Sequence, residues 1–204
     1  MIILRIDDVG RVSGDLPEHG SDAELEHFSR WRSECGLTGT PAIYGVVPQW
    51  VTRHSIERFK LVGDERWAVH GFNHRVRARV TLKQMQLGRE LTQADTYIAP
   101  FNEYTTQTVE DWGLAGGEYF LGGYELKVAR GELPQLTAGV VFVPAYSRLY
   151  GMARDLLHLL DDLPKYPVVL TLHVPWETDP VPVRALIDKI RDQLVPIEEA
   201  NKWL

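Results

Sequence analysis

Short apolar segments of strand length alternate along the chain with longer amphipathic segments of helical periodicity. Because a strand–helix–strand alternation produces a parallel sheet covered by helices, the pattern predicts one α/β domain over residues 1–204. The predicted strands are 2–6, 42–47, 67–69, 97–99, 118–121, 140–143, 167–172 and 195–197. The predicted helices are 21–34, 51–61, 81–94, 105–112, 153–163 and 183–194.

The length of the chain limits how such a sheet can close. Six to eight strand–helix units form either an open sheet or a barrel. Eight complete units usually need about 250 residues, whereas this chain has 204. A barrel formed by this chain is therefore expected to be trimmed or incomplete.

Composition and charge exclude several classes of protein. A single cysteine, Cys35, rules out an internal disulfide framework and a cysteine-rich zinc module. The net charge of −6 has the wrong sign for a general nucleic-acid binder, so no nucleic-acid partner is expected. No apolar run approaches the ~18 residues of a membrane span. Acidic residues at Asp7 and Asp8 leave no room for a signal peptide, so we expect a cytoplasmic protein.

Ionisable and polar residues follow four of the predicted strands. The carboxyl ends of parallel strands share one face of a barrel or sheet, and active sites lie on that face. We therefore expect these side chains to meet. They are Asp7 and Asp8 after strand 2–6, His70 and His74 after strand 67–69, Asn102 after strand 97–99, and His173 after strand 167–172.

This set of residue types fits a metal-dependent hydrolase. One carboxylate and two neutral imidazoles provide three ligands and leave a coordination position open for water. A divalent ion lowers the pKa of such a water towards about 7. A second carboxylate can then act as the base and a third histidine as the acid. Adjacent aspartates on an extended segment point in opposite directions, so Asp7 and Asp8 can take different roles.

Four segments resemble the ordered motifs of the polysaccharide deacetylases (carbohydrate esterase family 4), most closely a branch without signal peptides. They span residues 5–173, most of the chain, and follow the family's order. The resemblance implies a single domain with an incomplete or distorted (β/α) barrel of about seven parallel strands. The segments are Ile6-Asp7-Asp8-Val9-Gly10, His70-Gly71-Phe72-Asn73-His74, Ala99-Pro100-Phe101-Asn102 and Leu170-Thr171-Leu172-His173.

The resemblance also implies a reaction and a role for each residue. The reaction is hydrolysis of an acetyl group on an N-acetylated or O-acetylated sugar or polysaccharide. Asp7 corresponds to the catalytic base, and His173 to the catalytic acid that protonates the leaving group. Asp8, His70 and His74 correspond to the ligands of one divalent metal ion. Zinc is the expected ion, and cobalt or another divalent ion is the alternative.

Further residues are expected to bind the carbohydrate substrate. Pro100, Phe101 and Asn102 lie in the third motif, and Trp176 follows His173 closely enough for its ring to stack on a sugar. The resemblance places Leu170 and Leu172 in the wall of the acetyl pocket.

Three alternating arginines bear on the charge of the substrate. Arg75, Arg77 and Arg79 follow His74 directly. On a loop at the catalytic face they could hold an anionic sugar, a uronate or a phosphate. The substrate is therefore expected to be a carbohydrate, with an anionic one as an option.

The chain departs from the family pattern at two motifs. The third motif of the family begins with an arginine that orients the catalytic aspartate, and Ile98 occupies that position here. Arg5 lies two residues before Asp7, on the same side of an extended strand, so its guanidinium could pair with the Asp7 carboxylate instead. The fourth motif of the family, an aspartate and a tryptophan, has no clear counterpart.

Three alternatives remain open at this stage. The same ligand set could hydrolyse another non-peptide C–N bond, because the pocket and not the metal selects the substrate. The unmatched motifs leave room for a catalytically inactive barrel that only binds a glycan. Two histidines and a carboxylate also hold iron in oxygenases, but those usually have an all-β scaffold. The sequence makes no prediction of the oligomeric state.

Overall fold

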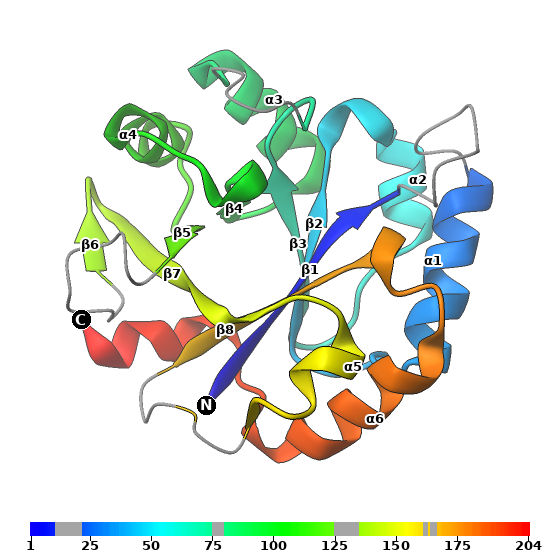
Figure 1. Cartoon of the computed structure of the whole chain (residues 1–204). Coiled ribbons are helices and arrows are strands. Elements are labelled where there is room, and N and C mark those ends of the chain that lie inside the picture. Colours follow the sequence, from blue (N-terminus) through cyan, green and yellow to red (C-terminus); the bar gives the residue numbers. More distant parts are fainter. Residues whose placement is uncertain (11–21, 75–79, 125–134, 161–162, 164–166) are drawn as a thin grey trace.

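The computed structural model describes residues 1–10, 22–74, 80–124, 135–160, 163 and 167–204 (Figure 1). Seven of its strands are joined edge to edge in parallel. The strands are β1 (Ile2–Val9), β2 (Ala42–Val46), β3 (Glu65–His70), β4 (Thr96–Ile98), β5 (Tyr119–Tyr124), β7 (Val140–Tyr150) and β8 (Val168–His173).

The parallel strands close into a barrel. The sheet runs in the order β5-β4-β3-β2-β1-β8-β7, and β7 also pairs in parallel with β5, which joins the two edges. The predicted (β/α) barrel of about seven parallel strands is therefore confirmed. A short strand that was not predicted, β6 (Gln135–Thr137), pairs antiparallel with the first residues of β7, along the edge opposite to the one that pairs with β5.

Helices surround the barrel (Figure 1). Thr81 begins α3 with a capping box, in which its hydroxyl accepts from the backbone N–H of Gln84 and its own N–H donates to the Gln84 side chain. The α-helices are α1 (Asp22–Glu34), α2 (Arg53–Arg58), α3 (Leu82–Thr92), α4 (Thr106–Leu114), α5 (Ala153–Leu156) and α6 (Pro180–Ile190). None of the described helices has the length and apolarity that a membrane span requires.

Two predicted elements are wrong. The helix predicted over 153–163 ends at Leu156, since the apolar residues beyond it divide between the core and solvent: Leu160 is buried whereas Leu159 is 47% exposed. The strand predicted over 195–197 is only a single bridge between Leu194 and Ile2. Pro196 lacks the N–H that would extend the pairing, and the 3-10 helix η6 (Ile197–Trp203) begins directly after it.

Alternation along the strands divides their side chains between two environments. One set faces outward and packs beneath α1, α5 and α6 or beneath α3 and α4. The other set fills the barrel, where Ile197 and Ala200 of η6 join it. Apolar residues of this inner set are Ile3, Ile43, Ala68, Ile98, Leu121, Val143 and Val169.

The inner set changes from apolar to polar towards the carboxyl ends of the strands. On β1, Ile3 is followed on the same side by Arg5 and Asp7, and on β8 Val169 is followed by Thr171 and His173. All four polar side chains are buried. Active sites of such barrels are built from polar groups at this end of the strands.

Candidate active site

A bulge in β1 brings two adjacent carboxylates to the site. The pairing of β1 with β2 shifts register between Ile6 and Val9, and Asp8 has a left-handed backbone with φ of 60°. Asp7 stays in register with His173 on β8. The expectation that Asp7 and Asp8 simply alternate on an extended strand is therefore wrong, because the bulge turns Asp8 back towards the centre that Asp7 faces.

Asp8, His70 and His74 come together as one cluster. Their candidate ligand atoms all lie within 4.8 Å of one another. Oδ1 of Asp8 is 3.5 Å from Nε2 of His70 and 3.0 Å from Nε2 of His74. His74 has a φ of 48°. Left-handed backbone at Asp8 and His74 costs conformational energy, and such strain concentrates at functional sites.

The environment of His70 tests whether these residues fit a cation. Nδ1 of His70 lies 3.2 Å from the carbonyl oxygen of Ile98, so Nδ1 carries the donated hydrogen and Nε2 is left with a lone pair. That lone pair faces Oδ1 of Asp8, and neither buried atom has a hydrogen-bond partner among the described residues. Two acceptors face each other, which favours a cation between them. The donor set of one carboxylate and two imidazoles fits a divalent metal.

The pKa values show how this cluster behaves without a metal. Burial raises the pKa of Asp8, but its close contact with His70 and the charges of His70 and His74 outweigh burial and hold that pKa well below its usual range. Burial lowers the pKa of His70, but the Asp7 and Asp8 carboxylates outweigh it and raise that pKa. A proton on His70 therefore takes the place of the cation.

Competition between this proton and a metal predicts a pH dependence. The raised pKa of His70 stabilises the metal-free fold below about pH 6.5, and this stabilisation is lost as the pH rises through the folded-state pKa. Metal binding must displace the same proton, so metal affinity weakens as the pH falls. We expect zinc to raise the melting temperature more at about pH 8 than at about pH 6, measured by calorimetry against chelator-treated protein. Equal shifts at both pH values would contradict proton–metal competition.

Arg5 holds the second carboxylate. Its Nε donates to Oδ1 of Asp7 at 2.8 Å and its Nη2 donates to Oδ2 at 2.5 Å, a two-point contact between side chains that are each 1% exposed. Its Nη1 donates to Oδ1 of Asn102 at 2.6 Å. Ile98, which occupies the position of the arginine in the motif that the sequence resembles, lies in the apolar interior of the barrel. Arg5 therefore reaches the aspartate from the same strand.

Asp7 remains a carboxylate in this setting. Burial raises its pKa, but the Arg5 guanidinium and the charge of His70 outweigh burial, so the pKa of Asp7 is lowered. Gly45 on β2 leaves room for the carboxylate, because a Cβ there would lie 3.2 Å from Oδ1 of Asp7. Oδ2 of Asp7 lies 3.9 Å from Nε2 of His70 and 3.7 Å from Nε2 of His173. Asp7 thus stands between the metal-ligand cluster and the third histidine.

His173 is enclosed by two aromatic residues. The ring of Trp176 stacks on the imidazole with centroids 3.9 Å apart, and the ring of Tyr150 meets it edge to face at 5.0 Å. The Tyr150 hydroxyl lies 3.2 Å from Nε2 of His173. Burial lowers the pKa of His173, and the opposing charges of Asp7 and Asp8 do not reverse this. His173 is therefore neutral at neutral pH.

The predicted substrate-binding residues lie in different environments. Phe101 is 43% exposed and its ring lies 4.9 Å from that of His74. Trp176 is 44% exposed, but one face of its ring is covered by His173, so only the outer face is open to a sugar. Pro100 packs on Gly71, where a Cβ would lie 2.5 Å from Cγ of the proline. Asn102 is buried and engaged by Arg5.

The expectation that Leu170 and Leu172 wall an acetyl pocket is wrong. Both are fully buried and belong to the outer apolar cluster beneath α1 and α6. Residues 171 and 173 face the site on the same strand, so residues 170 and 172 must face the helices. Arg75, Arg77 and Arg79 lie outside the residues that the structure describes.

Sequence reasoning missed three contributors to the site. Tyr150 contacts His173, the ring of Trp50 lies 5.6 Å from that of His74, and the backbone carbonyl of Ile98 fixes the tautomer of His70. The alternation of Tyr146, Arg148 and Tyr150 after the apolar run 140–143 could have indicated a longer strand ending in Tyr150.

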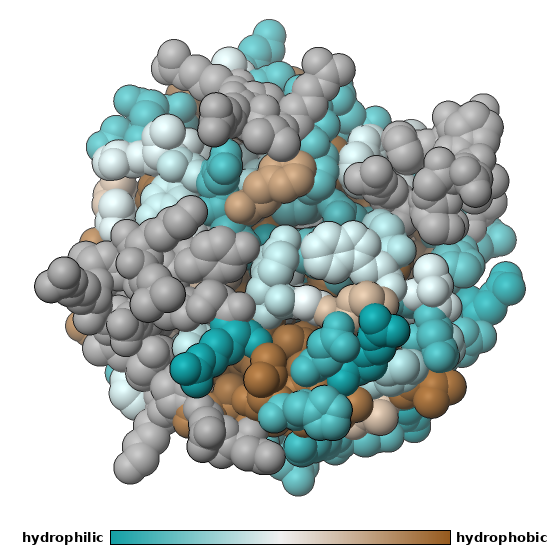
Figure 2. Space-filling view, in the orientation of Figure 1, coloured by the Kyte–Doolittle hydropathy of each residue, from teal (hydrophilic) through white to brown (hydrophobic). Residues whose placement is uncertain are grey.

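On the face seen in Figure 1, the arrowheads of β1 and β3, which mark the carboxyl ends of these strands, lie above the point where β1 and β8 cross. In the space-filling view, pale residues of intermediate hydropathy cover the middle of this face, with brown ones beside them (Figure 2). Such a surface suits a ligand that is polar at its edges and apolar on its faces.

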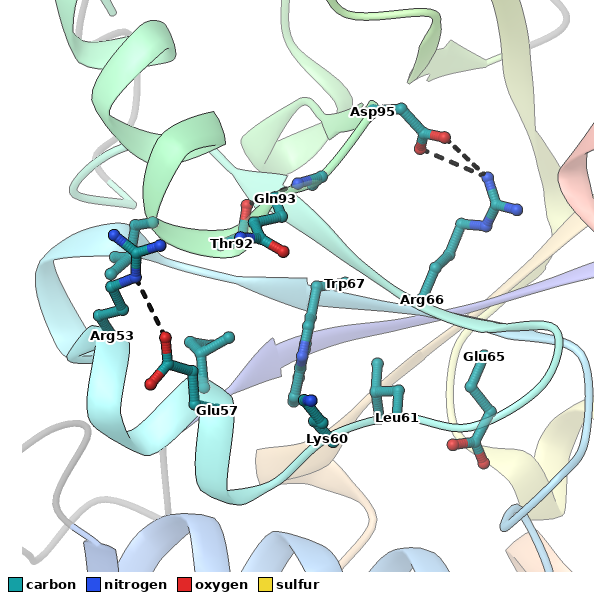
Figure 3. Close-up of a pocket in the computed structure, with 13 residues that line it drawn as sticks. Arg53, Glu57, Lys60, Leu61, Glu65, Arg66, Trp67, Thr92, Gln93 and Asp95 are labelled. Carbon is teal, nitrogen blue, oxygen red and sulfur yellow. Dashed lines mark hydrogen bonds and ion pairs between the residues drawn. The ribbon is translucent and has the colours of Figure 1, made fainter.

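A groove of about 730 Å³ lies at the opposite ends of the strands, between α2 and α3 (Figure 3). It is lined by residues that begin β3 and by Asp95, which precedes β4. Two ion pairs lie within its lining: Arg53 contacts Glu57 at 3.2 Å and Arg66 contacts Asp95 at 3.1 Å. Amino-terminal ends of barrel strands serve stability rather than catalysis, so this groove is not the candidate site.

Comparison with known proteins supports the fold. No model of a known protein family matches the sequence, and no curated protein matches it. A candidate polysaccharide deacetylase from Mycobacterium smegmatis has a similar structure, with a TM-score of 0.59 and 15% identity over 99% of this chain and 89% of that one. A family 4 carbohydrate esterase from Streptomyces lividans, solved with acetate, has a TM-score of 0.56 and 8% identity over 94% and 88% of the two chains.

A third similar structure shows how far this likeness extends. A 4-alpha-glucanotransferase from Thermococcus litoralis has a TM-score of 0.62 and 13% identity. The match covers all of this chain but only 40% of the transferase. At such identities the comparisons show a shared barrel fold, and the chemistry must be argued from the site.

Proposed function

We propose that this protein is a metal-dependent hydrolase that removes an acetyl group from an N-acetylated or O-acetylated sugar or polysaccharide. The observation that carries the proposal is the facing pair of buried acceptor atoms, Oδ1 of Asp8 and Nε2 of His70, with Nε2 of His74 beside them. The shared fold with a carbohydrate esterase and the ordered motifs support the choice of substrate.

Each site residue has a role in this reaction. Asp8, His70 and His74 would hold one divalent ion, zinc being the expected one, which would act as a Lewis acid and make water more acidic. Asp7, kept ionised by Arg5, accepts the proton of the attacking water. His173 supplies a proton on the leaving-group side. The exposed rings of Phe101 and Trp176 offer apolar faces to a sugar.

Metal analysis combined with an assay of acetate release tests the proposal. We expect purified wild-type protein to contain about one divalent ion per chain by elemental analysis, since three ligands form one site. The His70→Ala/His74→Ala double variant should contain none. Wild type loaded with zinc or cobalt should release acetate from at least one member of a panel of acetylated sugars, and the double variant from none.

The control is a His27→Ala/His54→Ala double variant, which removes two histidines outside the site and should keep both metal and activity. Wild type that binds no metal even after loading would overturn the hydrolytic mechanism and favour a glycan-binding barrel. Metal binding with release of products other than acetate would point to hydrolysis of another C–N bond.

A further inference from the structure

The side of the site that holds His173 also contains the hydroxyl group of Tyr150. Tyr150 is the last residue of β7, and it is paired in register with Thr171 of β8, two residues before His173. Its hydroxyl lies 3.2 Å from Nε2 of His173. The same nitrogen lies 3.7 Å from Oδ2 of Asp7. Asp7, His173 and Tyr150 therefore form a chain of proton-carrying atoms.

Packing fixes the position of this hydroxyl. The Tyr150 ring is edge to face with the His173 ring at 5.0 Å and with the Trp176 ring at 6.1 Å. Trp176 covers one face of the imidazole, and Nδ1 of His173 is buried without a hydrogen-bond partner among the described residues. The only described carboxylate within 4 Å of the His173 ring nitrogens is therefore Asp7, on the Nε2 side. Among the described residues, the groups that can exchange a proton with His173 lie on its Nε2 side.

We propose that Tyr150 is a further catalytic residue, whose hydroxyl contacts the leaving nitrogen or oxygen of the substrate, donates its own proton to that atom and is reprotonated through His173. This role rests on the proposed hydrolase function. It differs from the motif-based expectation, in which His173 alone protonates the leaving group.

The proposed step conserves protons. Asp7 takes a proton from water while the water oxygen bonds to the acyl carbon. That proton passes from Asp7 to Nε2 of His173 and from there to the phenolic oxygen of Tyr150. The proton already on Tyr150 bonds to the leaving atom as its bond to the acyl carbon breaks. Asp7, His173 and Tyr150 all end the turnover as they began it, and no outside acid is needed.

The Tyr150→Phe variant removes the hydroxyl and keeps the ring. We expect kcat to fall by about 10²-fold on an acetamido sugar that wild type hydrolyses, with KM unchanged, because an amine leaves only when protonated. On 4-nitrophenyl acetate, whose phenolate leaves without a proton, the rate should not change. Tyr146→Phe on the same strand is the matched control, since Tyr146 packs against the outer apolar cluster.

A structural readout separates the possible failures. In ¹⁵N NMR spectra of metal-loaded protein, the Nε2 resonance of His173 should shift in Tyr150→Phe and stay in place in Tyr146→Phe. Equal loss of rate on both substrates, no loss on either, or an unshifted resonance would overturn the role of Tyr150 alone. Wild type that hydrolyses neither substrate would overturn the proposed hydrolase and, with it, this catalytic role.

Discussion

Replacement of Asp7 by asparagine is expected to abolish turnover while the metal site survives. Asparagine has the size of aspartate but cannot accept the proton of the attacking water, and general base catalysis contributes about 10²–10⁴-fold to a rate. Asp7 is not one of the three clustered ligands, so metal content should remain that of wild type. Steady-state acetate release and elemental analysis of the same preparation measure the two quantities.

The Asp64→Asn variant provides a control for this experiment. Asp64 is exposed and lies outside the site, so the same chemical change there should leave the rate unaltered. Near-wild-type turnover in Asp7→Asn would show that Asp7 is not the base. A loss of metal together with activity would show that Asp7 belongs to the ligand set instead.

Replacement of Arg5 by methionine is expected to have the largest effect on stability. Methionine keeps much of the apolar volume but leaves the buried Asp7 carboxylate and Oδ1 of Asn102 without their donors. Loss of one partner of a buried ion pair costs about 3–5 kcal/mol. For a domain of this size that lowers the melting temperature by about 10 °C, measurable by calorimetry on metal-free protein.

The same variant should change the pH profile of any remaining activity. Arg5 is the group that lowers the pKa of Asp7 most, so its loss raises that pKa. A base must be deprotonated to act, and the acidic limb of kcat/KM should therefore move to higher pH. The Arg5→Met/Asp7→Leu double variant, with both charges removed, should recover part of the lost stability but no activity. Unchanged stability in Arg5→Met would contradict the structural role of the pair.

Periodicity in the sequence predicted a parallel α/β sheet and the meeting of its polar residues, because the carboxyl ends of parallel strands share one face. Periodicity left an open sheet and a barrel as alternatives, and only the resemblance of the motifs implied the barrel. The contact of Arg5 with Asp7 also follows from spacing, because residues two apart on a strand lie on the same side. These features depend on periodicity, which a sequence displays directly.

Other features of the site depend on local geometry that the sequence does not display. The bulge at Asp8 uses a left-handed backbone at an aspartate, where no glycine marks the position. β7 continues past its apolar run, but the sequence does not show this because only one side of the second half of the strand is buried. Leu149 is fully buried, whereas Arg148 is exposed. Tyr150 lies at the end of the second half of β7, which the predicted strand 140–143 does not include, so its contact with His173 was not predicted.

The packing of the C-terminal segment limits the routes by which substrate and products reach and leave the site. Ile197 and Ala200 of η6 pack against the apolar residues that fill the interior, and Val195 is bonded to Ile2 at the amino end of β1. The interior is therefore packed and this segment covers its amino-terminal end, so ligands reach the site from the carboxyl-end face. Under the proposed function, the deacetylated sugar and the acetate depart through the entrance that the next substrate uses. Acetate retained at that entrance should therefore act as a competitive inhibitor.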